Sequence, residues 1–230
     1  MRSPRIIASL SVGVAVLTAL ITACTTSDYD TGDGKLSYFR ADFVDIYTNS
    51  KSYFVNAMTD DGDSLVFANP ISAKWASTPD SSYRALLYYI NKVENQPQPR
   101  VAYSVLVPKL RPIKNVKTMY NDPVKMESAW RSKNGRYVNL CVGLVTGTNE
   151  GDDTKHAMGM VCDTLVVNDD GQKHLHLRLY HYRNGMPEYY TTKVYFSIPL
   201  KNNPYHLGTG DSLSLSVNTY DGWVTKTFTY

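Results

Sequence analysis

The chain has 230 residues, a formal net charge of only +3, 43% hydrophobic residues and 18 tyrosines. A chain so close to neutral lacks the high density of Lys and Arg that drives binding to a phosphate backbone. The composition therefore argues against nucleic acid as a partner. The hydrophobic content is sufficient for a packed core, and the many tyrosines favour β-sheet.

The N-terminal segment has the pattern of an export signal. A basic start with Arg2 and Arg5 precedes an uncharged apolar run over residues 6–21. That run is shorter than the roughly 20 residues of a comfortable membrane span. It ends in Ile21-Thr22-Ala23-Cys24, and a cysteine directly after aliphatic-Thr-Ala is the lipobox of bacterial lipoproteins. We therefore predict a signal peptide over residues 1–23 and acylation of Cys24, which anchors the chain in a membrane.

A polar, acidic segment follows the lipobox. Residues 24–35 include Asp28, Asp30 and Asp33 and are too polar to bury a core. These acids resemble a calcium loop only in part, because Gly32 stands where an oxygen ligand is needed. We predict a flexible tether and an outer-membrane lipoprotein that faces the periplasm or the cell surface. Loss of residues 1–23 removes Arg2 and Arg5 and no acid, so the charge falls from +3 to +1.

Short apolar or alternating runs broken by turn residues continue through the first half of the chain. They predict about five strands, at 36–47, 52–58, 64–68, 83–94 and 100–107. Pro108 and Pro112 then interrupt the pattern, since proline cannot donate to a β-ladder. We place a domain boundary near Leu110 to Lys117, with the first domain over residues 36–112.

The second half, residues 113–230, shows the same style. The predicted strands are at 136–146, 157–167, 174–180, 189–198, 212–219 and 223–229. The segment Asn168-Asp169-Asp170-Gly171 has the residues of a hairpin turn. Short strands at this regular spacing are typical of a β-sandwich.

The Pro123-Val124 segment leads to Ser128-Ala129-Trp130 and then to Gly135-Arg136-Tyr137-Val138-Asn139-Leu140. Together with the lipobox and the polar spacer, this order resembles the NigD-like lipoproteins. The resemblance implies an all-β chain, with an OB-like barrel followed by an immunoglobulin-like β-sandwich. It also implies a secreted lipoprotein from a family without an agreed biochemical role, and it transfers no catalytic residues.

Cys141 and Cys162 are equidistant from the middle of the polar loop at residues 148–154. A simple hairpin would place them opposite each other, with Cβ atoms about 4.5–5.5 Å apart, slightly above the usual disulfide range. A cross-strand disulfide and two packed thiols fit this geometry equally well. Neither cysteine has a local histidine partner that would mark a nucleophile.

His174 and His176 lie two residues apart on a predicted strand, so their side chains share one face. A zinc site needs at least a third protein ligand, and Arg178 continues the same face. His181 and His206 could complete a site only if the fold brought them close. We expect a solvated polar face, with no metal and no cofactor.

Aromatic side chains are the strongest hint of a ligand surface. The candidates for a flat platform are Trp75, Trp130 and Trp223, with the pairs Tyr88-Tyr89 and Tyr189-Tyr190. OB-like domains bind oligosaccharides and oligonucleotides on one face, yet aromatics also fill sheet cores. In an adjacent pair on a strand, only one ring can face the solvent side of the sheet.

Carboxylates form no obvious acid/base pair. The acidic pairs and triplets lie in turns beside glycine, where they bond to nearby backbone, as at Asp60-Asp61-Gly62-Asp63, Gly151-Asp152-Asp153 and Asp169-Asp170-Gly171. We expect a lipid-anchored, non-enzymatic envelope protein, a binding or assembly module with a glycan or an envelope protein as partner. One alternative is a glycan-binding accessory lipoprotein with exposed aromatics. A second is an envelope hydrolase, which requires a cleft with two convergent carboxylates.

Overall fold

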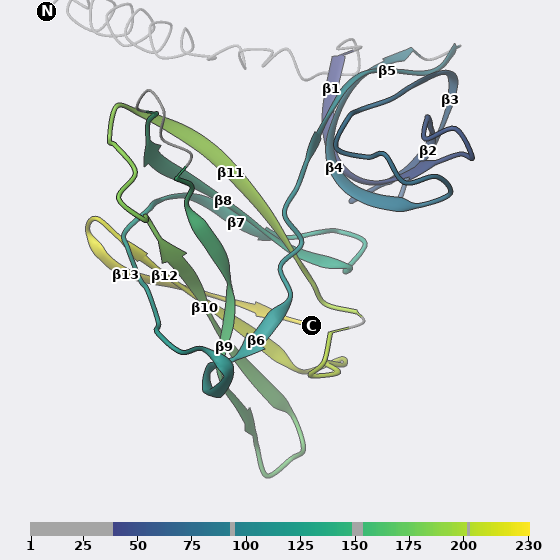
Figure 1. Cartoon of the computed structure of the whole chain (residues 1–230). Helices are drawn as coiled ribbons and strands as arrows, with labels where there is room; N and C mark the ends of the chain where they lie inside the picture. The colour runs from purple at the N-terminus through teal and green to yellow at the C-terminus, as the bar shows by residue number, and fades with distance from the viewer. Residues whose placement is uncertain (1–38, 93–94, 149–153, 202) are drawn as a thin grey trace, which may run out of the picture. The chain divides into compact units, whose positions relative to one another are not determined.

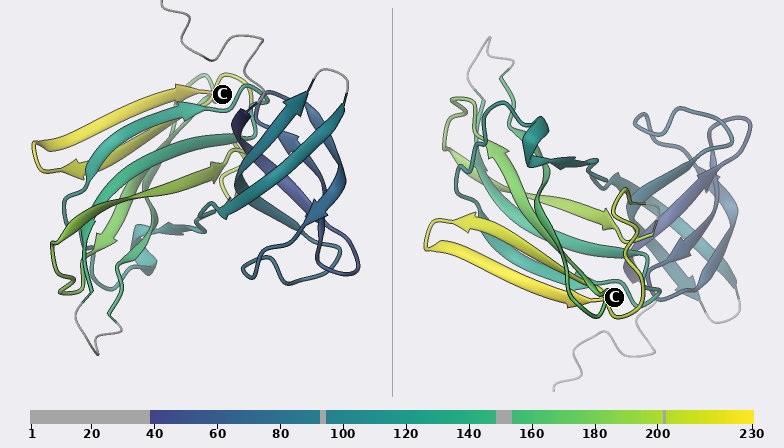
Figure 2. Two further views of the ribbon diagram at one scale, coloured as in Figure 1. Left: turned by 90° about the horizontal axis from the view of Figure 1, so that it is seen from above. Right: turned by 90° about the horizontal axis from the view of Figure 1, so that it is seen from below.

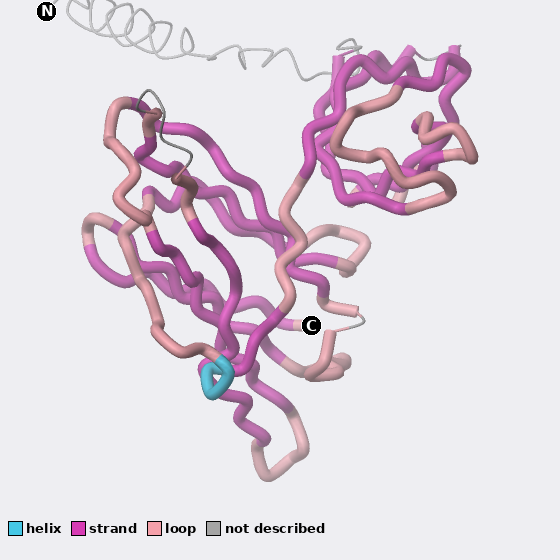
Figure 3. The backbone as a smooth tube through the Cα atoms, in the orientation of Figure 1, coloured by secondary structure: helices cyan, strands magenta, loops and turns pink. Residues whose placement is uncertain are grey.

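A computed structural model describes residues 39–92, 95–148, 154–201 and 203–230. The predicted signal peptide at 1–23, the predicted tether at 24–35 and the predicted lipidation site Cys24 lie outside these residues. The described part is almost entirely strand and loop, with a single 3₁₀ turn, η1 (Ile113–Asn115), drawn in cyan in Figure 3. No helix of this part is both long and apolar enough to span a bilayer.

The first five strands form one curled sheet (Figure 1). They are β1 (Phe39–Thr48), β2 (Phe54–Thr59), β3 (Ser64–Ile71), β4 (Ser82–Lys92) and β5 (Asn95–Ser104). Their order is β3-β2-β1-β4-β5, and β3 also lies against β5, so the sheet closes on itself as an OB-like barrel.

Alternation along the strands builds the barrel core. Val44 and Ile46 on β1 and Leu87 and Tyr89 on β4 point inward and are almost completely buried. Tyr88, one position earlier, lies on the outer face and is half-buried. The expectation that this tyrosine pair would divide between the two faces is therefore confirmed.

The remaining strands form two sheets packed face to face as a β-sandwich (Figure 2). They are β6 (Leu110–Pro112), β7 (Lys125–Arg131), β8 (Tyr137–Thr146), β9 (Ala157–Val167), β10 (Lys173–Tyr182), β11 (Tyr190–Pro199), β12 (Ser212–Thr219) and β13 (Gly222–Thr229). One sheet has the order β13-β12-β10-β9-β6 and the other β11-β8-β7. The predicted fold class, an OB-like barrel followed by an immunoglobulin-like sandwich, is confirmed.

Two short segments differ from the strands and domains predicted from the sequence. Leu110–Pro112, assigned there to the first domain, forms β6 and pairs in parallel with Met160–Cys162 of β9 in the sandwich. A proline is compatible with this position because β6 is an edge strand. Lys125–Arg131, for which no strand was predicted, forms β7 at the edge of the smaller sheet.

Neither arrangement considered for Cys141 and Cys162, a cross-strand disulfide or two thiols packed side by side across a hairpin, is present. Cys141 lies opposite Tyr195 on β11, whereas Cys162 lies opposite Leu177 on β10, so the two cysteines belong to different sheets. The connection after β8 crosses from one sheet to the other instead of turning back beside it. Both cysteines are buried free thiols, and burial raises the pKa of each.

Candidate functional site

The three tryptophans do not form a common platform. Trp75 packs in the barrel, where its Nε1 donates to the carbonyl oxygen of Ala102 at 3.1 Å. Trp130 is half-buried and meets Phe43 edge-on, with 5.3 Å between ring centroids. Only Trp223 is largely exposed, at 53%, with a guanidinium group 5.6 Å from its ring centroid.

The two histidines of β10 lie on its outer face, as predicted. The rings of His174 and His176 stack with centroids 4.1 Å apart, and His174 Nε2 lies 2.7 Å from Ser214 Oγ. Arg178, next on this face, is paired with Asp163 at 2.7 Å. In the described part of the chain, no group of three or more His, Cys, Asp or Glu side chains is placed to hold a metal ion.

Two carboxylates do meet in the fold, around a buried arginine. Arg84 Nη2 donates to Asp60 Oδ2 at 2.7 Å, and Arg84 Nη1 lies 3.7 Å from Asp45 Oδ1. The Arg84 Nε also donates to Ser197 Oγ of β11 at 2.9 Å, which joins the barrel to the sandwich. The sequence pattern predicted only a turn at Asp60 and did not predict its ion pair with Arg84. The available signal was Arg84 itself, a lone charge in the apolar run of β4.

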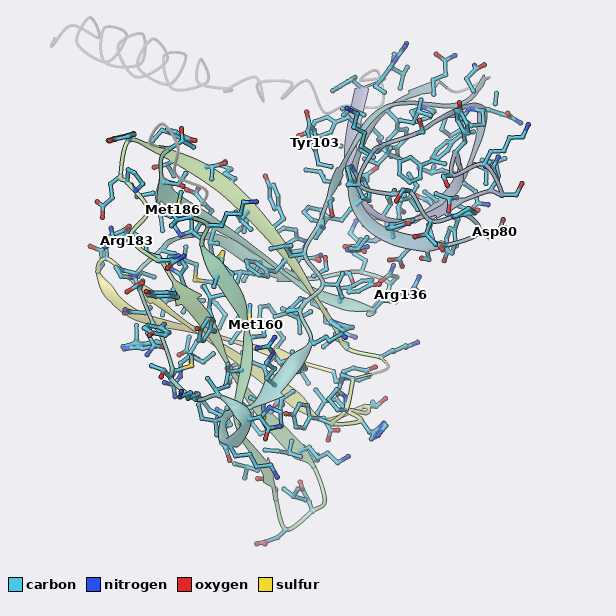
Figure 4. The ribbon with its side chains drawn as sticks, in the orientation of Figure 1. Asp80, Tyr103, Arg136, Met160, Arg183 and Met186 are labelled. Atoms are coloured by element: carbon cyan, nitrogen blue, oxygen red, sulfur yellow. The ribbon has the colours of Figure 1, made fainter. Side chains whose placement is uncertain are left out.

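Polar side chains of β8 complete this joint. Asn139 Nδ2 donates to Asp60 Oδ2 at 2.8 Å, and Tyr137 OH donates to Asp45 Oδ1 at 2.8 Å. Arg136, labelled in Figure 4, pairs with Asp45 at 2.6 Å. Burial and the Asp45 carboxylate raise the pKa of Tyr137 to about 12. Because both carboxylates are neutralised by arginine, the joint holds the two domains together and offers no free acid/base pair.

An open groove lies along β9 and the segment that precedes and follows β6. We call it the β9 groove; its volume is about 890 Å³. Its lining residues are Pro108, Lys109, Arg111, Asn115, Val116, Lys117, Thr118, Tyr120, His156, Ala157, Met158, Gly159, Met160, Val161 and Tyr180. Met160 (labelled in Figure 4) belongs to the sandwich core, so the groove is built directly on the packed part of the domain.

The β9 groove is cationic. Lys109, Arg111 and Lys117 line it and are exposed, while no aspartate or glutamate is among its lining residues. Among the described residues, none of these three cations takes part in an ion pair. This local excess of positive charge contrasts with the near-neutral chain and favours an anionic ligand.

Tyrosines form one wall of the groove. The ring of Tyr120 lies 4.1 Å from that of Tyr182 and meets Tyr180 edge-on at 6.0 Å, centroid to centroid. Gly159 on β9 faces open space, since a Cβ atom there would have no neighbour within 4 Å. The wall is therefore held by ring packing, and the groove stays open opposite Gly159.

His156, which lines the groove, forms a pair with His181. His181 is 2% exposed and its Nδ1 donates to the carbonyl oxygen of Asp122 at 2.8 Å, so its Nε2 accepts a hydrogen bond from His156 Nδ1 at 2.9 Å. Burial lowers the pKa of both rings; for His156 the neighbouring His181 and Arg183 lower it further, and for His181 Arg183 acts in the same direction. The carboxylate of Asp122 opposes these shifts. His181 thus belongs to this pair and not to the His174–His176 face.

Stability is expected to fall as the pH drops below about 6.5, the ordinary histidine pKa. The unfolded chain takes up protons there, whereas His156 and His181 in the fold do so only at lower pH, which favours unfolding. Thermal unfolding followed by circular dichroism from pH 7.5 to 5.5 measures the effect. The variant His156→Gln/His181→Gln should show a flatter profile, while His174→Gln, on the half-exposed outer face, should retain most of the slope. An unchanged slope in the double variant would contradict the assignment.

Residues 107–230 match the family model of the NigD-like C-terminal beta sandwich domain. The fold is similar to that of a NigD-like immunity protein from Bacteroides caccae, with 19% identity and a TM-score of 0.60 over 81% of this chain and 91% of the other. A protein of unknown function from Bacteroides vulgatus has 18% identity and a TM-score of 0.59, over 84% and 90%. A candidate lipoprotein from Bacteroides fragilis has 12% identity and a TM-score of 0.54, over 83% and 96%. No curated protein matches the chain.

Proposed function

Since the chain belongs to the NigD-like family, we propose that it is a lipid-anchored, non-enzymatic protein of the cell envelope that binds a ligand in the β9 groove. The observation that carries the proposal is the groove itself, an open cavity of about 890 Å³ along β9. Sites of this size on a preformed scaffold accommodate molecules as large as a short oligomer.

The chemistry of the lining favours binding over catalysis. No carboxylate, thiol or serine lines the groove, so it offers no serine or cysteine nucleophile and no carboxylate acid/base pair. His156 lines it, but its Nδ1 already donates to His181, and burial lowers its pKa. Outside the groove, Asp45 and Asp60 are occupied by Arg84. These features do not support the hydrolase alternative.

A glycan-binding accessory role is the second candidate, and the tyrosine wall favours it. Tyr120 and Tyr180 line the groove, and aromatic rings offer flat apolar faces beside polar groups. In this role the aromatic surface that contacts the ligand lies in the groove and is not formed by Trp75, Trp130 and Trp223. Of those three, only Trp223 remains an exposed ring.

The anchor is tested by replacing Cys24 with Ala. The variant should lose metabolic labelling with palmitate completely, because the lipobox cysteine is the acyl acceptor. Cys141→Ala and Cys162→Ala are the matched controls, since both cysteines are buried free thiols, and they should keep the label. Retained label in Cys24→Ala would show that the proposed outer-membrane anchoring through this residue is wrong.

The groove is tested by filling it. A panel of oligosaccharides is titrated against the wild-type chain and against Gly159→Phe, whose side chain projects into open space. Any ligand that binds the wild type and not this variant supports a groove function, and its recovery unchanged supports a non-enzymatic role. If no binding depends on Gly159, the groove is not the functional site.

A further inference from the structure

We infer that the ligand of the β9 groove is an acidic oligosaccharide, a sugar chain that carries carboxylate or sulfate groups. This inference rests on the proposed function and specifies the ligand class for the same site. It assigns Lys109, Arg111 and Lys117 to the acidic groups and the rings of Tyr120 and Tyr180 to the sugar faces.

The positive charges of the groove come from one segment of the chain. The segment from Pro108 to Thr118 contains Lys109, Arg111, Lys114 and Lys117 and no acid. Three of these cations line the groove, and Lys114, on η1, does not. Like charges gathered without a counter-charge repel one another, so an anionic ligand is favoured there. The parallel pairing of Arg111 with Val161 holds one cation at a fixed place beside the groove floor.

The size and the polar groups of the groove favour a sugar chain over a small anion. A single phosphate or sulfate ion would occupy a small part of about 890 Å³. Asn115 and Thr118 add an amide and a hydroxyl group to the lining, which can bond to sugar hydroxyls. Arg111 and Tyr180 both line the groove, so it contains a cation and an aromatic ring. An acidic sugar chain has acidic groups for the cations of the groove and apolar ring faces for its tyrosines.

The experiment uses the full-length lipoprotein in micelles of a nonionic polyoxyethylene detergent. Calorimetric titrations compare an oligogalacturonate, which is carboxylated, a heparin-derived oligosaccharide, which is sulfated, and a neutral isomalto-oligosaccharide of equal length. Phosphatidylglycerol added to the micelles tests whether an anionic lipid headgroup competes. The expected result is binding of an acidic chain without binding of the neutral one, and weaker binding as salt rises.

Three variants locate the site. Lys109→Ala/Lys117→Ala should weaken binding about fivefold, since two exposed ion pairs of typical strength together contribute about this much. Lys114→Ala removes the same charge outside the groove and should leave the affinity unchanged. Gly159→Phe should abolish binding. The melting temperatures of all three should match the wild type, because the mutated positions are exposed or face open space.

The outcomes separate the two proposals. Equal binding of neutral and acidic chains that is lost in Gly159→Phe overturns the acidic class and leaves the groove function intact. No binding of any sugar, in micelles with or without phosphatidylglycerol, overturns the inference. Acidic chains that bind equally to wild type and Gly159→Phe overturn both, because the binding then lies elsewhere.

Discussion

Replacing Arg84 with Met is expected to lower the free energy of unfolding by about 3–5 kcal/mol. The Arg84 side chain is only 2% exposed, and the side chains of Asp45 and Asp60 are 4% and 13% exposed. Methionine fills a similar volume but leaves two buried carboxylates without their shared cation. An uncompensated buried charge is far costlier than the net contribution of an intact pair.

Urea unfolding of the wild type and the variant measures this loss. Lys133→Ala is the matched control, because Lys133 and Asp61 also join the sandwich to the barrel at 3.0 Å but are 76% and 53% exposed. It should cost less than about 1 kcal/mol. A second control, Arg84→Met with Asp45→Asn and Asp60→Asn, should recover part of the stability because no buried carboxylate is left unpaired, and Arg136, which loses Asp45, is 39% exposed. If Arg84→Met lowered the free energy of unfolding no more than Lys133→Ala, the buried ion pairs of Arg84 would not stabilise the joint.

Replacing Phe196 with Ala is expected to cost about 3–5 kcal/mol. Phe196 is 1% exposed and lies in the core of the sandwich, on the inward face of β11. Its neighbour Ser197 accepts a hydrogen bond from Arg84 at the domain joint. The substitution therefore creates a cavity in the sandwich without removing any side chain of the joint.

Urea unfolding followed by both circular dichroism and tyrosine fluorescence measures this effect. Phe196→Leu keeps most of the apolar volume and should cost less than about 1.5 kcal/mol, which separates the cavity from a general effect of mutation at this position. We expect barrel and sandwich to unfold in one transition in both variants, since buried bonds of Arg84 link them. Two separate transitions would contradict that coupling.

Local patterns in the sequence predicted most of the strands and the fold class. Alternation over residues 174–180 places leucines inside and His174 and His176 outside, as the structure confirms. It also divides Tyr88 from Tyr89. The NigD-like resemblance rested on the lipobox, the polar spacer and the segment from Pro123 to Leu140, and the family match confirms it. Side-chain alternation follows from the backbone geometry of a single strand and requires no knowledge of its partners.

These local patterns could not predict which strands pair with each other. The sequence distance from Cys141 to Cys162 was compatible with a hairpin, but the connection between them crosses to the other sheet. β8 is buried on both faces, and its outer face carries Asn139 of the domain joint. A run buried on two sides has no alternation from which the second partner could be read.

By itself, the sequence determined an all-β chain and the faces of its strands, because both depend on residues close together in the chain, and it predicts lipidation at Cys24. Only the tertiary structure decided which charges meet. Arg84 joins Asp45 and Asp60 to Ser197 across 113 positions, and His156 joins His181 across 25. It also gathered three cations and two tyrosines around Gly159. The physical reason is that ion pairs, buried hydrogen bonds and grooves depend on separation in space, which spacing along the chain does not specify.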